Sequence, residues 1–216
     1  MHPIISIVGK SDSGKTTLLE KLITELKRRD YRVAVIKHSN EDYELDTAKK
    51  DSWRLNQAGS DITAICLAHK IAIFKPLEDD FSPEDFSHYI CWDYDIILTE
   101  GFKRNSYPKI EVHRAEQGDD LLSPLEQLLA VVTDVPIEVN VPQFSRDDTL
   151  EIINLIENNI ISQNKNDTVD LMVNEKPISV RRPVRNLLTR TIIAMSVGLN
   201  VTSKVKSLRF SLRRKN

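Results

Sequence analysis

The stretch that decides the fold is IISIVGKSDSGKTTLL, residues 4–19. Its first five residues are mostly apolar and predict a buried strand, and the residues from Thr17 onward have the apolar spacing of an amphipathic helix. Between them, GKSDSGKT at residues 9–16 matches G-x-x-x-x-G-K-[ST] at every fixed position. Such a loop turns backbone N–H groups toward a phosphate, and the helix start adds unpaired donors and the positive end of its dipole. The stretch therefore predicts a polyphosphate-binding loop.

The residues of this loop have distinct predicted roles. Gly9 and Gly14 stand where the backbone needs conformations or close approaches that a side chain would block. Lys15 is expected to bridge the β and γ phosphates, and the Thr16 hydroxyl to coordinate Mg²⁺. The alternative is a glycine-rich turn that binds no ligand. The predicted nucleotide contacts within the loop are Gly9, Lys10, Ser11, Asp12, Ser13, Gly14, Lys15, Thr16 and Thr17.

Lys10 has a second interpretation. One class of dimeric P-loop ATPases carries an additional lysine five residues before the main one, and that lysine reaches the partner's phosphates. Two glycines usually follow it, whereas Ser11 and Asp12 follow here. A solvated loop lysine is therefore the alternative.

The chain around the loop alternates strand and helix signals, which is typical of an α/β fold with a largely parallel sheet flanked by helices. A polar stretch, a short helix at 51–58 and a hairpin at 62–75 interrupt this pattern, and Ser82 to Asp85 carry the chemistry of a helix start. The last strand of the body is expected at 126–134 and an amphipathic helix at 145–160. The other predicted strands are IISIVG (4–9), RVAVIKH (32–38), YDIILTEG (94–101) and PKIEVHR (108–114).

Composition divides the chain into an acidic body and a basic end. The 216 residues carry a formal charge of −2, but residues 164–216 contain twelve Lys and Arg against three Asp and Glu, so that end carries +9 and residues 1–163 carry −11. We expect a P-loop nucleotide-binding domain at 1–161, a linker at 162–167 and a small basic α+β module at 168–216. The module should contain a strand, a turn, a second extended piece, a basic helix at 181–200 and a final strand at 204–214.

The sequence has no run of ~18 to 20 apolar residues and no signal-peptide pattern at its start, so we expect a cytoplasmic protein without membrane contact. Cys66 and Cys91 stand alone in apolar segments, and we interpret both as small buried hydrophobic residues.

Acidic residues at strand ends are candidates for the metal and for the base. Glu100 ends an apolar strand, and Asp46 lies in the polar loop after the second strand; either could hold Mg²⁺ together with Thr16. Asp95 begins its strand, which places it at the far end of the sheet. Asp134 ends the last body strand; guanine-specific P-loop proteins carry an aspartate after a late strand that pairs with the base, and a plain turn residue is the alternative.

Several stretches together resemble the MobB proteins of molybdenum-cofactor biosynthesis, the molybdopterin-guanine dinucleotide adaptor proteins. The phosphate loop alone is unspecific, but the later stretches make a distinctive combination and run in the family's order across roughly residues 3 to 160. The stretches are GKSDSGKTTLLEKLI, VAVIKHS, DTAKKDSWRLNQAGSD, DIILTEGFKRNSYPKIEVHR and LLAVVTDVP.

The resemblance implies a dimeric GTP-binding protein that uses Mg²⁺ and hydrolyses GTP weakly. Such a protein assists a MobA-like guanylyltransferase, which joins GMP to molybdopterin. No catalytic residue is assigned. We interpret Trp53 as a residue that anchors its helix in the core or at a subunit contact, and stacking on the pterin is the alternative. The resemblance implies a cleft for the pterin or the partner that includes Lys37, His38, Asp46, Asp51, Arg54, Glu100, Gly101 and Lys103.

Two other functions are compatible with the sequence. A P-loop small-molecule kinase would need a basic lid over the phosphates, and only Lys103 and Arg104 in the loop 101–109 offer one. Phosphate transfer to an acceptor would identify such a kinase. A module that binds nucleic acid through the basic end would lose oligonucleotide affinity steeply with salt. The sequence carries no helix-turn-helix, zinc-finger or aromatic RNA-binding signature.

Overall fold

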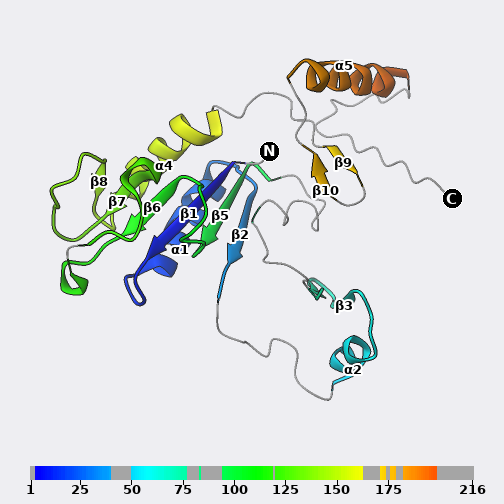
Figure 1. The fold of residues 1–216 in the computed structure, drawn as a ribbon, viewed down its shortest axis with the longest axis horizontal. Helices are drawn as coiled ribbons and strands as arrows, with labels where there is room; N and C mark the ends of the chain where they lie inside the picture. The colour runs from blue at the N-terminus through cyan, green and yellow to red at the C-terminus, as the bar shows by residue number, and fades with distance from the viewer. Residues whose placement is uncertain are drawn as a thin grey trace.

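A computed structural model of the chain describes residues 3–39, 50–76, 83, 94–118, 120–162, 171–173, 176–178 and 182–198. Within these ranges the central element is a six-stranded sheet in the order β2-β5-β1-β6-β7-β8 (Figure 1). All neighbouring strands in it pair in parallel. The strands are β1 (Ile4–Gly9), β2 (Val33–Lys37), β5 (Ile96–Glu100), β6 (Lys109–Val112), β7 (Leu128–Val132) and β8 (Gln143–Phe144).

β8 corrects the sequence analysis, in which 126–134 was the last strand of the body. Val131 and Val132 of β7 pair with Gln143 and Phe144, which add a sixth strand to the sheet. Two residues are too few to show a hydrophobic period, so this strand has no sequence signal of its own. It is held by its pairing with β7 and by hydrogen bonds between the Gln143 side chain and the backbone of Ile137.

The helix α1 (Lys15–Arg28) lies against the sheet because its apolar residues fall on one stripe. Leu18, Leu19, Leu22 and Leu26 are all buried, as the predicted amphipathic spacing requires. The helix α4 (Thr149–Ile156) and the π-helical turn Glu157–Ile161 that continues it share the same cluster. Both helices therefore cover one face of the sheet, and a smaller cluster built from Ile4, Ala34, Ile36, Ile97 and Phe102 lies on the other face.

Polar residues are buried beside the apolar ones in β6. Lys109 is fully buried and donates hydrogen bonds from Nζ to the carbonyl oxygens of Asn105 and Tyr107 and to Oε1 of Gln127. Burial lowers the pKa of its ammonium group. Glu111, two residues on, accepts bonds from the backbone N–H groups of the loop that contains Leu122 and Ser123. These contacts fix both loops that flank β6.

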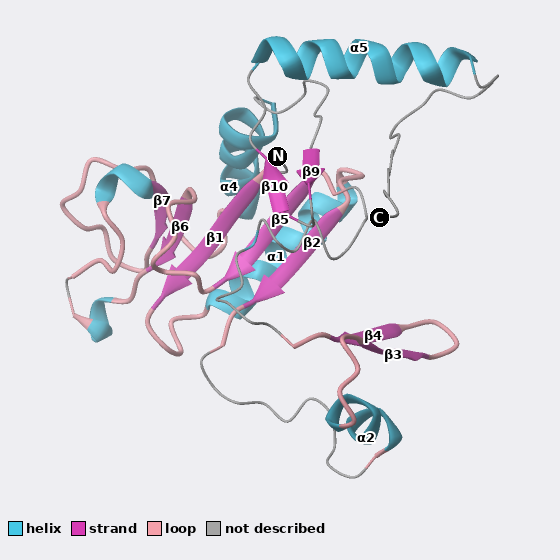
Figure 2. Cartoon of the chain, turned by 45° about the vertical axis from the view of Figure 1, so that its right-hand side comes forward, coloured by secondary structure: helices cyan, strands magenta, loops and turns pink. Residues whose placement is uncertain are grey.

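A separate small unit is formed by α2 (Asp51–Gln57) and an antiparallel hairpin of β3 (Thr63–Cys66) and β4 (Ile71–Phe74). Figures 1 and 2 both show it set off from the edge of the sheet where β2 ends. The predicted helix and hairpin are confirmed. Cys66 is exposed, which corrects its assignment as a buried residue, because it ends an exposed hairpin strand. Cys91 and the helix start at Ser82 lie outside the described residues, apart from Pro83, which is helical.

In the basic end of the chain the structure describes an antiparallel pair, β9 (Leu171–Val173) with β10 (Lys176–Ile178), and the helix α5 (Arg182–Gly198). The strand predicted at 204–214 lies outside the described residues. Across the described part of the chain, no helix combines the length and the apolar composition that crossing a bilayer requires.

Candidate functional site

The loop between β1 and α1 lies at the carboxyl end of the central strand of the sheet, with β5 on one side and β6 on the other. Gly14 has φ +97° and Gly9 has φ +152°, both in the region that favours glycine. A Cβ on Gly9 would lie 2.5 Å from the carbonyl oxygen of Val112, and one on Gly14 would lie 3.0 Å from a guanidinium nitrogen of Arg114. The two glycines therefore permit a backbone that other residues would block.

Lys15 begins α1 and turns its ammonium group back over the loop. Its Nζ donates to the carbonyl oxygen of Lys10 at 2.5 Å. Burial lowers the pKa of this ammonium group; Lys103 and Lys37 act in the same direction, while Glu100 and Asp12 oppose them. A partly desolvated cation that is bonded to a neutral carbonyl is well placed to bind an anionic phosphate, since charge-assisted bonds are the stronger ones.

Thr16 and Glu100 lie together, as the metal prediction requires. The Thr16 hydroxyl donates to Oε2 of Glu100 at 2.9 Å, and Lys37 lies 3.7 Å from Oε1 of the same carboxylate. A hydroxyl and a carboxylate at the mouth of the loop are oxygen donors of the kind that Mg²⁺ prefers, so this pair fits the predicted ion. Asp46, the other candidate, lies outside the described residues. Among the described residues, no group of three or more His, Cys, Asp or Glu side chains could hold a metal.

The ends of β2 and β5 bring part of the predicted cleft together. His38 and Glu100 are joined by a backbone hydrogen bond of 3.0 Å, and a Cβ on Gly101 would touch the backbone and Cβ of His38 at 3.3 Å. The ring of His38 lies 4.7 Å from that of Phe102, whose φ of +53° turns the chain at this point. Lys103 follows and is exposed.

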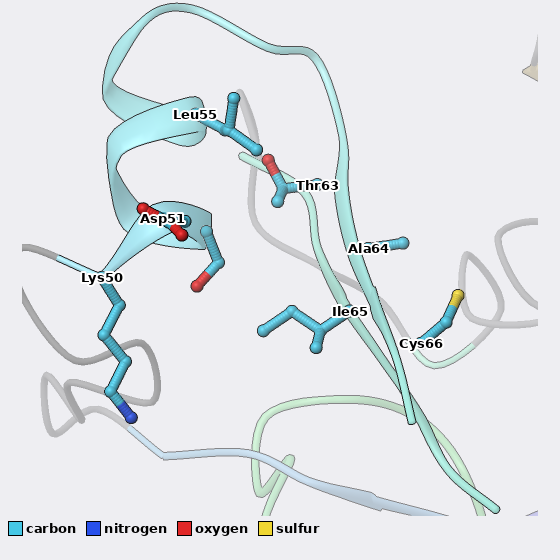
Figure 3. Close-up of a pocket in the computed structure, with 8 residues that line it drawn as sticks. Lys50, Asp51, Leu55, Thr63, Ala64, Ile65 and Cys66 are labelled. Carbon is cyan, nitrogen blue, oxygen red and sulfur yellow. The ribbon is translucent and has the colours of Figure 1, made fainter. Parts of the chain in front are cut away.

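Asp51 and Arg54 lie elsewhere, on α2, where they pair with each other at 3.5 Å. Trp53, on the same helix, is half-buried. A cavity of about 550 Å³ opens between α2 and the hairpin (Figure 3). Its lining combines a few polar groups with apolar side chains; the residues are Lys50, Asp51, Ser52, Leu55, Thr63, Ala64, Ile65 and Cys66. The predicted cleft residues therefore fall in two places, one at the sheet and one on the α2 unit.

Asp134 lies on the side of the loop opposite to Glu100, after β7. Its Oδ1 accepts a bond from the backbone N–H of Ala115 at 3.3 Å, and its Oδ2 lies 3.5 Å from the guanidinium of Arg114. The Ala115 hydrogen bond and, to a lesser degree, Arg114 lower the pKa of its carboxyl group. The side chain is 36% exposed, so it remains reachable by a ligand.

The short 3-10 helix η1 (Ala115–Gln117) and the residue before it contact the phosphate loop, which the sequence analysis did not predict. Arg114 donates from Nε to the carbonyl oxygen of Ser13 at 2.9 Å, and Gln117 donates to that of Ser11 at 2.7 Å. Lys10 donates to the carbonyl oxygen of Gln117. The Lys10 ammonium group is thus bonded within its own chain. Arg114 lies in the stretch PKIEVHR. The residues around it in the sequence do not predict its contact with the phosphate loop.

Comparison with known proteins shows the family to which this chain belongs. The family described as "Molybdopterin guanine dinucleotide synthesis protein B", MobB, matches residues 4–134, from the first residue of β1 to Asp134. A molybdopterin-guanine dinucleotide biosynthesis adapter protein of Haemophilus influenzae is 40% identical over 160 residues, which are 72% of this chain and 88% of that protein. The Escherichia coli adapter protein is 33% identical over 147 residues, which are 65% of this chain and 83% of that protein.

Solved structures agree with the sequence comparison. The X-ray structure of a MobB homolog from Bacillus stearothermophilus aligns with a TM-score of 0.56 and 26% identity, over 72% of this chain and 95% of that one. The crystal structure of Bacillus subtilis MobB aligns with a TM-score of 0.59 and 25% identity, over 72% of this chain and 96% of that one.

Proposed function

The chain belongs to the MobB family of molybdopterin guanine dinucleotide synthesis proteins, and on that premise we propose that it is a GTP-binding adapter for the attachment of GMP to molybdopterin. The observation that carries the proposal is the pairing of an intact phosphate loop with the Thr16–Glu100 contact of 2.9 Å at its mouth. This arrangement supplies a cation, backbone donors and a metal-binding oxygen pair within one loop and one strand end.

The proposed nucleotide site uses the backbone N–H groups of residues 9–16 and the first turn of α1, with Lys15 on the β and γ phosphates. Thr16 and Glu100 hold Mg²⁺, with Asp46 as a further metal ligand. Asp134 reads the guanine base. Glu100 is bonded to Thr16 and paired with Lys37, which suits it to hold a metal ion, and neither an arginine finger nor a water-positioning glutamine stands out in the sequence. We therefore expect slow GTP hydrolysis.

The pterin and its partner enzyme, a MobA-like guanylyltransferase, are proposed to approach the ends of β2 and β5. Lys37 and Lys103 are exposed cations there, and a phosphorylated pterin is an anion. Because this reaction consumes GTP and a cofactor precursor, we place the protein in the cytoplasm.

The α2 unit is proposed to pair two copies of the chain. Leu55, Ile62, Leu67, Ile71 and Ile73 on it each expose 47% or more of their surface, which is a large apolar area for a unit of this size. Burial of that area against a second copy supplies a driving force for association. Ile73→Asp should shift sedimentation toward the monomer; a wild-type protein that sediments as a monomer at micromolar concentration contradicts the proposal.

A reconstituted assay tests the function. The protein is mixed with GTP, molybdopterin and a guanylyltransferase, and formation of the dinucleotide is followed with and without the protein. The wild-type protein should increase the yield, and Lys15→Ala should abolish the increase and the binding of GTP in a calorimetric titration. Lys27→Ala, a change of the same kind at the other end of α1, is the control and should behave as wild type. An unchanged GTP affinity in Lys15→Ala refutes the phosphate-site assignment.

A further inference from the structure

The segment Arg114–Gly118 lies between the phosphate loop and Asp134 and contacts both. On one side, Arg114 and Gln117 donate to the carbonyl oxygens of Ser13 and Ser11. On the other side, the Arg114 guanidinium and the N–H of Ala115 hold the Asp134 carboxylate. One short segment thus joins two places that approach each other only in the folded protein.

Arg114 is the centre of this arrangement. Its side chain is 12% exposed, so the guanidinium is largely withdrawn from water. Nε binds the Ser13 carbonyl at 2.9 Å, a second nitrogen faces Asp134 at 3.5 Å, and the third lies next to Gly14. A planar guanidinium with donors in fixed directions can serve several acceptors at once, which a lysine ammonium group on a flexible stem does less well.

The contacts on Asp134 leave it able to bind a ligand. A carboxylate offers about four lone-pair sites on two oxygens. Ala115 occupies one site on Oδ1 and Arg114 one site on Oδ2, and the backbone N–H of Asp134 also contacts the carboxylate, so these contacts do not fill all of its sites. Both contacts favour the ionised carboxylate, which is the form that accepts hydrogen bonds on both oxygens.

We propose that Arg114 is a positioning residue for nucleobase selection, which holds the Asp134 carboxylate at a fixed place relative to the phosphate loop. The inference rests on the proposed GTP function and deepens it. Guanine presents a ring N–H and an exocyclic amine side by side, and two oxygens held in place accept both. Adenine presents an unprotonated ring nitrogen at the corresponding position, which repels a carboxylate. Without Arg114 the carboxylate can rotate away from the loop, and the discrimination between the two bases falls.

The test measures affinities for GTP, ATP and tripolyphosphate by calorimetry in wild type, Arg114→Gln, Arg114→Lys, Ala115→Pro and Asp134→Asn. Arg114→Gln should lower the ratio of GTP to ATP affinity about tenfold, which is the scale of one lost hydrogen-bond contact. Arg114→Lys should restore part of the ratio. Ala115→Pro removes the other donor to Asp134 and keeps Arg114, so it should also lower the ratio of GTP to ATP affinity. Proline suits the first position of a helical turn, so the backbone should tolerate this change.

A double variant shows whether Arg114 acts through Asp134. Arg114→Gln combined with Asp134→Asn should have the same ratio as Asp134→Asn alone, because coupled residues are not additive. Arg32→Gln, which breaks an Arg–Asp pair with Asp95 at the opposite end of the sheet, is the matched control and should keep the wild-type ratio. A variant that is merely less well folded should lose affinity for all three ligands together and leave the ratio unchanged.

Three results overturn the inference. The first is a wild-type ratio in Arg114→Gln, and the second is additive loss in the double variant. The third is a wild-type protein that binds GTP and ATP equally well, which removes base reading but leaves the phosphate site standing. A wild-type protein that binds none of the three ligands contradicts the proposed function itself, so the two failures can be told apart.

Discussion

Gly9 shows how much a single residue can decide at this site. Its φ of +152° is strained for any residue with a side chain, and a Cβ would also lie 2.5 Å from the Val112 carbonyl oxygen and 2.7 Å from Oγ of Ser13. The first contact is with backbone of the neighbouring strand β6, which cannot move without disturbing the sheet. The path of the phosphate loop therefore depends on the missing Cβ.

Gly9→Ala should consequently lower the stability by about 1–3 kcal/mol, the cost of a strained backbone conformation, and should abolish GTP binding. Urea unfolding and calorimetry measure the two effects. Gly59→Ala is the matched control, because Gly59 also has a positive φ, of +96°, but a Cβ there meets nothing within 4 Å. It should lose stability through its backbone alone and bind GTP normally. A Gly9→Ala protein with wild-type GTP affinity contradicts the steric argument.

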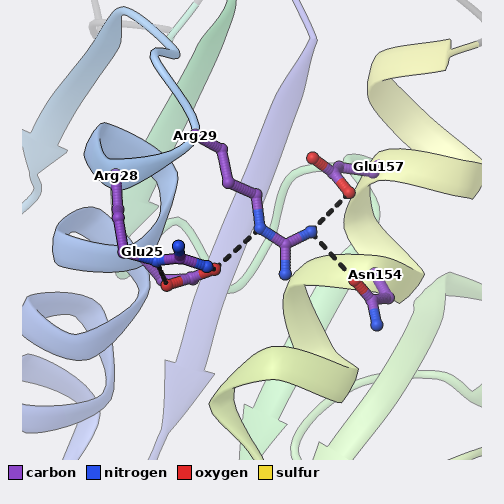
Figure 4. A network of polar contacts seen from close by, with 5 residues as sticks. All are labelled: Glu25, Arg28, Arg29, Asn154 and Glu157. Atoms are coloured by element: carbon purple, nitrogen blue, oxygen red, sulfur yellow. Dashed lines mark hydrogen bonds and ion pairs between the residues drawn. The ribbon is translucent and has the colours of Figure 1, made fainter.

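At the scale of the element, α1 is held at its carboxyl end by a charged network (Figure 4). Glu25 accepts bonds from Arg28 and Arg29, at 2.7 Å to each Nε. Arg29 also donates to Asn154 at 2.8 Å and to Glu157 at 2.6 Å, so it joins α1 to α4 and to the π-helical turn. The hydrogen bonds from Arg28 and Arg29 lower the pKa of Glu25 to about 2.

This network predicts an acid-dependent stability. The folded pKa of about 2 lies below the ordinary value of 4.5, so the contribution of Glu25 is fully present above pH 4.5 and is lost as the pH falls toward 2. Glu25→Gln should lower the melting temperature by about 2–4 °C at neutral pH and by less at pH 3. Thermal melts across this range measure it, with Glu20→Gln, an exposed acid on the same helix, as the control. An equal difference between the Glu25→Gln protein and wild type at both pH values speaks against the assigned pKa.

Some elements and contacts of this fold could be predicted from the sequence, and others could not. The strand, loop and helix of residues 4–28 follow from local spacing and were predicted, and so was the proximity of Glu100 to the loop, because parallel strands end at one edge. Arg114 was missed because its partners Ser13 and Asp134 lie 101 and 20 residues away in sequence. β8 was missed because it consists of two residues, and Cys66 because exposure of a hairpin strand depends on what packs against it.

At the scale of the whole molecule, the phosphate site and the main core lie in the first three quarters of the chain. The core cluster ends with Ile161, and the family match ends at residue 134. The +9 charge of residues 164–216 lies beyond both. In α5, Val184, Leu187 and Met195 are exposed, and none of these three side chains packs into the core cluster of the body. We therefore expect the chain to divide into two domains at residues 162–167.

A chain that ends at residue 162 should then fold and bind GTP with a Kd within about twofold of the full protein. Calorimetry on both proteins, with thermal melts to verify folding, measures this. If the shortened chain binds GTP but no longer raises dinucleotide yield, the basic end acts on the partner enzyme or the pterin. A shortened chain that loses GTP binding while still folded contradicts the proposed division into domains.

The helix α1 connects the proposed nucleotide site at its amino end to the π-helical turn near its carboxyl end. A helix of 14 residues is a stiff rod about 21 Å long. Its amino end carries Lys15 and Thr16 of the proposed nucleotide site. Arg29, just past its carboxyl end, forms an ion pair with Glu157 in the π-helical turn that ends at Ile161. One stiff helix and one ion pair thus connect the proposed nucleotide site to the start of the basic segment, and we infer that filling the site changes the position of that start without a second ligand contact.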